Sequence, residues 1–311
     1  MIDILMATYN GDAHIRQQLD SIFAQSFTDW RLIIRDDGST DGTLDIINEY
    51  MAFYPDKIKL IRDDMPTGSA KGNFLELIRA SDGEYMAFAD QDDVWHRDKL
   101  AKSYEAMKVL ELQYGAGVPL MVHTDLNVVD ERLGQLAPSF TRLMKLPVKK
   151  HLRDIIIQNS VVGCTMIINR TLADMCGELR DVSRILMHDH AIAIMAYAYG
   201  HAAYIDAPLV DYRQHGDNQV GAKEGLALFS FVRRFKAGKK HFRDDMDASY
   251  EQVAYILECY GRDFVKPEYD AMLAGYARLG QAGTKGKREF YKKYKIYKHG
   301  FLKKLVQILW S

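Results

Sequence analysis

A short acidic segment in the N-terminal half could hold a divalent cation. Asp90, Asp92 and Asp93 directly follow the apolar run Tyr85–Ala89. Carboxylates clustered on one turn offer the oxygen ligands that Mg2+ and Mn2+ prefer. An ion held there could bind a diphosphate and neutralise the charge of a leaving phosphate. Most Asp-x-Asp triplets are solvated turns, so the prediction depends on the position of this one after a buried strand.

A second acidic pair, Asp36 and Asp37, follows the apolar segment Leu32–Arg35. A turn with a helix N-cap at Thr40 or Asp41 accounts for much of this segment. A turn needs only one of the two aspartates, however. We therefore expect Asp37 to accept a hydrogen bond from the imide N–H of uracil or thymine.

Asp189 stands where a helix is expected to begin. The segment Met187–His190 opens an apolar helical run, Ala191–Tyr199. An aspartate at this position caps the helix and favours its dipole. A metal site made by His188 and His190 is not expected, because neighbouring side chains of a helix point in different directions.

The apolar pattern predicts an α/β fold with a mostly parallel sheet. The expected strands are Ile2–Ala7, Leu32–Arg35, Ile58–Ile61, Tyr85–Ala89, Leu120–His123, Cys164–Asn169 and Ala203–Ile205. The expected helices between the first four are His14–Ala24, Thr43–Phe53 and Asn73–Ala80. Ligands of such sheets bind beyond the carboxyl ends of the strands, where the polar clusters fall. No GxGxxG follows the first strand, which argues against a dinucleotide-binding domain.

Charge and cysteine content narrow the class of protein. The 311 residues include 41 Lys and Arg against 42 Asp and Glu, and this balance argues against a general nucleic-acid binder. Cys164, Cys176 and Cys259 show no CxxC spacing, which fits a reducing cytoplasm without disulfides or a zinc site. No apolar run approaches the ~20 residues of a membrane span, so we expect a soluble or peripheral protein.

The character of the chain changes after about Gly221. We place a domain boundary there, between a catalytic domain of residues 1–221 and a helical region of residues 222–311. From Lys285 onward, basic residues alternate with aromatic ones, a pattern typical of a helix lying on a membrane surface. The alternative is a helix packed on the catalytic domain with a solvated basic face. The aromatic residues of Phe229–Tyr260 fit a homodimer interface equally well.

Three ordered motifs resemble glycosyltransferase family 2, and more closely its bacterial rhamnosyltransferases: Ile4–Gly11, Arg35–Thr43 and Phe88–Trp95. The resemblance covers roughly residues 1–221. It implies a GT-A fold with a helical C-terminal extension, a Mn2+ or Mg2+ ion, and inversion at the anomeric carbon. The implied reaction moves L-rhamnose from dTDP-L-rhamnose to a glycan, plausibly carried on a polyprenyl diphosphate. The enzyme would be cytoplasmic and peripheral on the inner face of the membrane.

The resemblance also implies roles for single residues. The donor nucleotide would contact Thr8, Tyr9, Asn10, Asp37, Lys71, Asp90 and Arg213. Asp92 would be the principal metal ligand, together with Asp90 and with His215 from a closing loop. Asp189 would be the catalytic base. The acceptor side would include Asn159, Gly163, Cys164 and His188, with Cys164 contributing packing.

Other functions fit parts of this pattern. The same mechanism could use a UDP-hexose donor. A nucleotidyltransferase would need a Gly-rich phosphate loop near the N-terminus, and Thr8–Asp12 is not one. A non-catalytic nucleotide- or glycan-binding subunit would not need Asp37, Asp92 and Asp189 together.

Overall fold

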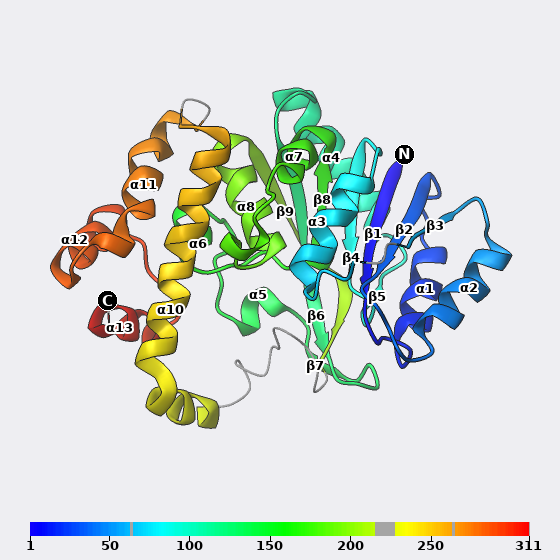
Figure 1. The fold of residues 1–311 in the computed structure, drawn as a ribbon, viewed down its shortest axis with the longest axis horizontal. Coiled ribbons are helices and arrows are strands. Elements are labelled where there is room, and N and C mark those ends of the chain that lie inside the picture. Colours follow the sequence, from blue (N-terminus) through cyan, green and yellow to red (C-terminus); the bar gives the residue numbers. More distant parts are fainter. Residues whose placement is uncertain (63–64, 215–227, 263–264, 311) are drawn as a thin grey trace.

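A computed structural model describes residues 1–62, 65–214, 228–262 and 265–310, with backbone only at 228–237 and 301. Within this part, nine strands form one sheet in the order β3-β2-β1-β4-β8-β6-β9-β5, and β7 pairs with β6 (Figure 1). Their bounds are β1 Ile2–Thr8, β2 Trp30–Asp36, β3 Ile58–Ile61, β4 Tyr85–Ala89, β5 Val94–Trp95, β6 Leu120–Val129, β7 Gln135–Ala137, β8 Met166–Asn169 and β9 His201–Arg213.

The sheet is parallel where the sequence predicts it to be. β1 pairs in parallel with both β2 and β4, and β2 pairs in parallel with β3. The carboxyl ends of these strands therefore lie along one edge. β8 runs antiparallel between β4 and β6, and the two-residue β5 runs antiparallel to β9. This mixed half of the sheet extends the predicted fold without changing the edge at which the polar motifs meet.

Helices cover both faces of the sheet. One face packs against α1 Ile15–Phe23, α2 Thr43–Phe53 and α4 Lys99–Tyr114. The other packs against α3 Ala70–Ala80, α6 Leu152–Ile157, α7 Arg170–Gly177 and α8 His188–Tyr199. A short helix, α5 Phe140–Leu143, lies beside β6. This is the helix-covered sheet that the sequence predicts.

Helix α8 is buried almost all round. Every side chain of the helix is buried except Tyr197, which is partly exposed. A helix that is apolar on all sides belongs inside a protein, and α8 is in contact with α6, β9 and the C-terminal helices. Asp189 stands in its first turn, so this carboxyl is brought into a buried environment by the helix that carries it.

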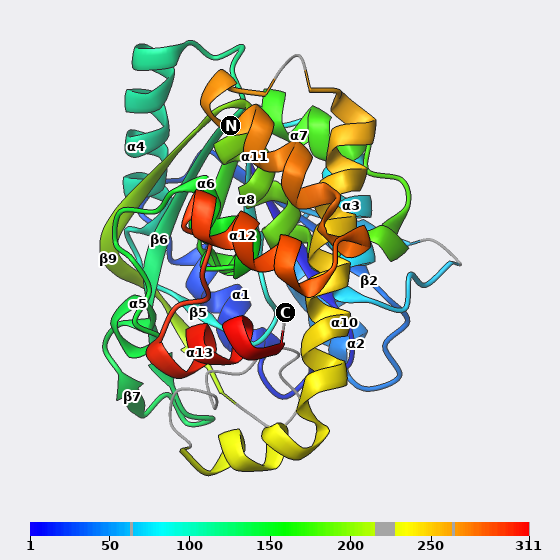
Figure 2. The same ribbon diagram turned by 90° about the vertical axis from the view of Figure 1, so that its left-hand side faces the viewer.

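The C-terminal helices form a layer on the α6 and α8 side (Figure 2). They are α10 Leu228–Tyr260, α11 Pro267–Ala277, α12 Thr284–Tyr294 and α13 Phe301–Trp310. Buried side chains of α10, α11 and α12 belong to the same apolar cluster as those of α3 and α8. The proposed boundary at Gly221 lies outside the described residues.

Aromatic residues after Lys285 that were expected at a membrane surface pack against the protein. Tyr291 is buried and its hydroxyl pairs with that of Tyr250, while Phe290, Tyr294 and Trp310 pack against the core. For α12 these contacts favour the alternative of a packed helix with a solvated basic face, and membrane contact of the C-terminal region stays a prediction. The large apolar side chains that are exposed after Lys285 lie on α13: Leu302, Leu305, Ile308 and Leu309. Among the described residues, none of the helices has the length and apolar character needed to cross a bilayer.

The turn from α8 into β9 gives a test of the packing. A Cβ added at Gly200 would lie 1.8 Å from the Pro119 carbonyl oxygen, which also accepts the His201 N–H at 2.9 Å. Because that oxygen anchors the start of the β6–β9 pairing, it cannot move freely. We expect Gly200→Ala to lower the free energy of unfolding by about 1–3 kcal/mol in denaturant titrations.

Gly117→Ala is the matched control, since no atom lies within 4 Å of its added Cβ. Its unfolding free energy should stay within about 0.5 kcal/mol of the parent. Equal stability of the two variants would contradict the proposed close contact.

Candidate functional site

Two loops meet at the carboxyl ends of β1 and β2. Thr8 and Asp36 are register partners at the ends of these strands, and the buried Thr8 hydroxyl donates to the Asp36 carboxylate at 2.8 Å. Asn10 has a positive φ of 46° and donates its N–H to the Ser39 hydroxyl at 2.8 Å. Tyr9, which lies between these two residues in the sequence, is exposed. Of the predicted nucleotide contacts, Tyr9 and Asn10 therefore face solvent, while Thr8 lies beneath them.

The Asp37 carboxylate is buried and already satisfied. It accepts hydrogen bonds from Arg35 at 2.9 Å, from the Gly68 N–H at 2.8 Å, and from both the N–H and the hydroxyl of Thr67. Burial opposes its ionisation, yet these donors hold the pKa of Asp37 below its usual value. The observed role of Asp37 is to fix the loop before α3, and its contact with a nucleobase stays a prediction.

Lys71 lies in the first turn of α3. Its ammonium donates to the Ile185 carbonyl, in the segment just before α8. The side chain therefore ties the start of α3 to the segment that leads to Asp189. It is half-buried, and its predicted contact with the nucleotide stays a prediction.

Gln91 is a residue of the site that the sequence pattern does not single out. Its side-chain oxygen accepts the Tyr9 N–H at 2.9 Å, and its side-chain nitrogen donates to the Tyr9 carbonyl at 2.9 Å. A Cβ at Gly11 would lie 2.4 Å from the same amide group. The acidic turn and the loop after β1 are thus joined through one amide. In the sequence, Gly11 is the signal of this contact, because a residue without a side chain leaves room for the Gln91 amide.

The Asp90–Asp93 turn is held from below by Arg213. This buried guanidinium donates to the Asp92 carbonyl at 2.7 Å, and also to the Glu131 carbonyl and the Gln17 side chain. The Arg213 N–H donates to the Asp93 carboxylate at 3.2 Å. Arg213 was predicted to reach the diphosphate. The structure gives it a positioning role at the backbone of the turn, and His215 lies outside the described residues.

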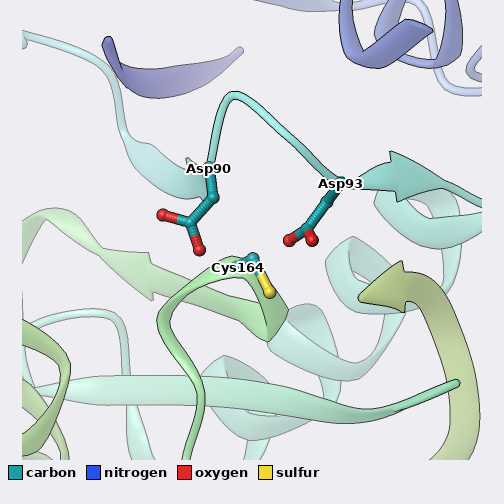
Figure 3. Close-up of side chains that lie close together, drawn as sticks. All are labelled: Asp90, Asp93 and Cys164. Atoms are coloured by element: carbon teal, nitrogen blue, oxygen red, sulfur yellow. The ribbon is translucent and has the colours of Figure 1, made fainter. Parts of the chain in front are cut away.

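Cys164 was predicted on the acceptor side, but the structure places its thiol beneath the acidic turn. The ligand atoms of Asp90, Asp93 and Cys164 all lie within 4.8 Å of one another, and both carboxyls point toward the sulfur (Figure 3). Burial raises the pKa of the Cys164 thiol well above its usual value, with Asp93 and Asp90 adding to the effect. Burial also lowers the pKa of nearby Lys99 to about 8. A protonated thiol fits the packing role expected for Cys164.

Asp189 lies across from this turn. Its carboxylate accepts the Asn159 side-chain N–H at 2.9 Å and the Gly163 N–H at 3.2 Å. Burial raises the pKa of Asp189 to about 7 despite these bonds. Burial, with the charges of Asp92 and Asp189, raises the pKa of Asp90 to about 8. The structure therefore brings the predicted base, two predicted acceptor-side residues and the acidic turn into one site.

His188 contributes packing to the site. Its ring stacks on Phe74 with centroids 4.1 Å apart, and its nitrogens have no hydrogen-bond partner. Burial lowers its pKa to about 3. His190 instead approaches the Ile155 carbonyl through Nε2 at 2.8 Å. The two rings therefore contact different elements, His188 the Phe74 ring of α3 and His190 the backbone of α6.

The acidic turn has the donor set that a hard divalent cation requires. The Asp93 Oδ2 atom is buried without a hydrogen-bond partner, and burial, with repulsion from neighbouring carboxyls, raises the pKa values of Asp90 and Asp93. A cation removes that repulsion, and carboxylate oxygens are suitable ligands for Mg2+ or Mn2+. The residues present fit such an ion, with Asp90 and Asp92 as its predicted ligands.

A substitution of Arg213 tests its positioning role. Lysine keeps the charge, but its compact ammonium cannot reach the three acceptors that separate guanidinium nitrogens contact, so Arg213→Lys leaves buried groups unpaired. We expect a loss of about 2–3 kcal/mol in the free energy of unfolding, and a smaller rise in melting temperature on addition of Mn2+. The exposed Arg132→Lys is the control and should change stability by less than about 0.5 kcal/mol. Parent-like stability and Mn2+ response of Arg213→Lys would rule the role out.

Comparisons with known proteins place this geometry in a wider context. The dTDP-rhamnosyl transferase RfbG of Shigella flexneri is 31% identical over 241 residues, covering 74% of this chain and 77% of that protein. The Escherichia coli UDP-Glc:alpha-D-GlcNAc-diphosphoundecaprenol beta-1,3-glucosyltransferase WfgD is 26% identical over 173 residues, 55% of this chain and 61% of that protein.

Structural similarity supports the same grouping. The structure of S. aureus TarS 1-349 in complex with UDP aligns with a TM-score of 0.56 at 16% identity, covering 94% of this chain and 91% of that one. This likeness shows the fold, which is the expected GT-A architecture. The family model described as glycosyl transferase family 2 matches residues 3–170. The chain therefore belongs to glycosyl transferase family 2.

Proposed function

We propose that this protein transfers L-rhamnose from dTDP-L-rhamnose to a hydroxyl of a lipid-linked glycan, with inversion at the anomeric carbon. The observation that carries the proposal is the buried Asp189 carboxylate, held by Asn159 and Gly163 across from the Asp90–Asp93 turn. The donor is inferred from the 31% identical relative, which is named as a dTDP-rhamnosyl transferase.

Asp189 is suited to accept the proton of the attacking hydroxyl. A pKa of about 7 leaves the carboxylate ionised in part of the molecules near neutral pH and basic enough to take a proton. The Asn159 and Gly163 N–H groups fix its orientation. One displacement at the anomeric carbon inverts its configuration, so a single base suffices and no enzyme nucleophile is needed.

The donor half of the site binds the nucleotide diphosphate. When bound, a divalent cation supplies positive charge that neutralises the leaving diphosphate, and Asp90 and Asp92 would hold it. Gln91 keeps the acidic turn in register with the Tyr9 loop, so nucleotide and diphosphate contacts are set by one unit. Tyr9 is exposed and available to a nucleobase.

The acceptor is proposed to be lipid-linked, with the enzyme at the membrane surface. The 26% identical relative is named for a diphosphoundecaprenol-linked substrate. On α13, Leu302, Leu305 and Leu309 recur at helical spacing and are exposed, next to the exposed Lys304. An apolar helix face flanked by lysine suits the interface of an anionic bilayer. These residues replace the aromatic ones as the proposed membrane contacts.

The same mechanism with a UDP-hexose donor is the second candidate. One relative is named as a UDP-Glc-dependent glucosyltransferase, and one similar structure holds UDP. The residues described above do not distinguish L-rhamnose from a hexose. Donor identity is therefore the first quantity to measure.

The test is a donor panel with the purified protein. We expect Mn2+-dependent release of dTDP from dTDP-L-rhamnose, with no release after addition of EDTA. The released nucleotide is measured by chromatography. UDP-glucose, UDP-N-acetylglucosamine and GDP-mannose are the competing donors. Preferential release from a UDP-sugar would replace rhamnose by a hexose. Absence of both turnover and Mn2+-dependent binding for every donor would overturn the proposed function.

The base assignment predicts the effect of one substitution and of pH. Asp189→Asn should lower kcat by about 100-fold or more, because the amide cannot accept the proton. For the parent at saturating Mn2+, kcat/KM should fall as pH decreases, with a midpoint at or below pH 7. The reason is that burial raises the pKa of Asp189 to about 7 and a nearby cation can only lower it.

Asp174→Asn is the matched control for this substitution. The Asp174 side chain is exposed on α7 and pairs only with Arg170, so kcat should stay within about twofold of the parent. If Asp189→Asn turns over like this control, another group must be the base.

A further inference from the structure

A cavity of about 200 Å3 lies where the C-terminal layer meets the catalytic half. Its walls include Asn159, Leu186 and His190 from the catalytic half, and Asp245 and Met246 from α10, with Lys298 before α13. In Figure 2, α8 lies on the side of the catalytic half that the C-terminal layer covers, and α10 belongs to that layer. The cavity is therefore built by segments far apart in the sequence.

The cavity adjoins the proposed base. Leu186 and His190 flank Asp189 in the sequence, at the start of α8. Asn159 lines the cavity and also donates to the Asp189 carboxylate at 2.9 Å. Asp189 itself is not among the lining residues, so a molecule bound in the cavity would lie beside the residues that hold the proposed base. The donor-side residues of the Asp90–Asp93 turn do not line it.

Most polar groups of the walls are already engaged within the protein. His190 uses Nε2 on the Ile155 carbonyl and Nδ1 with Gln252. The Asn159 amide bonds to Asp189 and to the Val161 N–H, which leaves one amide hydrogen and one lone pair. Recognition of a ligand then depends on the charged groups at the opening.

Asp245 is the polar group best placed to bind a ligand. Its side chain is about half exposed at 51%, and the His241 ring lies 3.8 Å away. A carboxylate accepts hydrogen bonds from neighbouring hydroxyls through two oxygens. Leu186 and Met246 add apolar surface, which suits the C–H face of a sugar ring. The walls thus combine the two features that carbohydrates require.

We propose that this cavity binds a sugar unit of the acceptor, with Asp245 accepting hydrogen bonds from its hydroxyls. The proposal rests on the glycosyl transfer proposed above. It assigns acceptor recognition to α10, a helix outside the segment that matches the family model, residues 3–170. The catalytic half supplies the base and the donor site, and the C-terminal layer supplies the second wall of the acceptor site.

The test measures acceptor kinetics with defined probes. The purified full chain is given dTDP-L-rhamnose and Mn2+, and the nucleotide release is followed with a panel of p-nitrophenyl glycosides: glucoside, galactoside, N-acetylglucosaminide and rhamnoside in both anomers. We expect at least one glycoside to accelerate release. For that glycoside, Asp245→Ala should raise KM about tenfold or more while kcat is retained, because hydrogen bonds to a charged group are lost.

Two further variants separate binding from folding. Asp245→Asn keeps one acceptor oxygen and should give a smaller rise in KM than Asp245→Ala. Asp244→Ala is the matched control, since Asp244 is the exposed neighbour on α10 that does not line the cavity. Release without any acceptor shows that the donor site of each variant is formed.

The outcomes distinguish this proposal from the proposed function. An unchanged glycoside KM in Asp245→Ala overturns the acceptor assignment, as does a failure of every glycoside to accelerate an enzyme that still hydrolyses its donor. In both cases glycosyl transfer stands. Failure of the unaltered protein to turn over or bind any donor overturns the proposed function and this assignment together.

Discussion

Burial of carboxyls at the end of β4 is the constraint on which the site depends. Asp90 and Asp93 lie close together in a buried region, and burial, with repulsion from neighbouring carboxyls, raises the pKa values of both. Such a turn keeps its shape only if fixed donors hold it. Arg213 supplies them from below, at the backbone of Asp92 and at the Asp93 carboxylate. The turn is therefore shaped by the protein before any cation binds.

The same constraint explains why the two nucleotide-side loops form one unit. Gln91 lies between two acidic residues, yet its amide bonds to the Tyr9 backbone and leaves the carboxyls free to converge below. Gly11 leaves room for that amide. A shift of the acidic turn would thus shift the Tyr9 loop as well. The proposed cation and nucleotide contacts are thereby linked through two hydrogen bonds that involve no charge.

The regular elements and the location of the site could be predicted from the sequence, because both depend on local patterns. Apolar runs ending in polar residues identify β1, β2 and β4, and parallel strands bring their carboxyl ends together. The two-residue β5 has no pattern of its own, since a pairing partner alone defines it. The position of Cys164 beneath the acidic turn had no local signal, because it follows from the antiparallel pairing of β8, the next strand, with β4.

The roles of charged and aromatic side chains were harder to predict, because they depend on partners distant in sequence. Arg213 and Lys71 were expected at a ligand, and the structure shows both engaged with backbone carbonyls. Tyr291 looked like a membrane anchor until Tyr250 of α10 supplied a buried partner. Residue type gives the capacity of a side chain to bind. The tertiary contacts decide what it binds.

The shared core ties the C-terminal helices to the proposed site as well as to the fold. Tyr276 of α11 donates to the Ile156 carbonyl in α6, and Gln252 of α10 contacts His190, the residue after the proposed base. The position of α8, and with it of Asp189, therefore depends on helices beyond the family segment. Under the acceptor assignment proposed above, changes on the exposed side of α10 would alter what enters the cavity, while changes on its buried side would also move Asp189. Only the first kind of change would then let acceptor choice diverge without disturbing the proposed base.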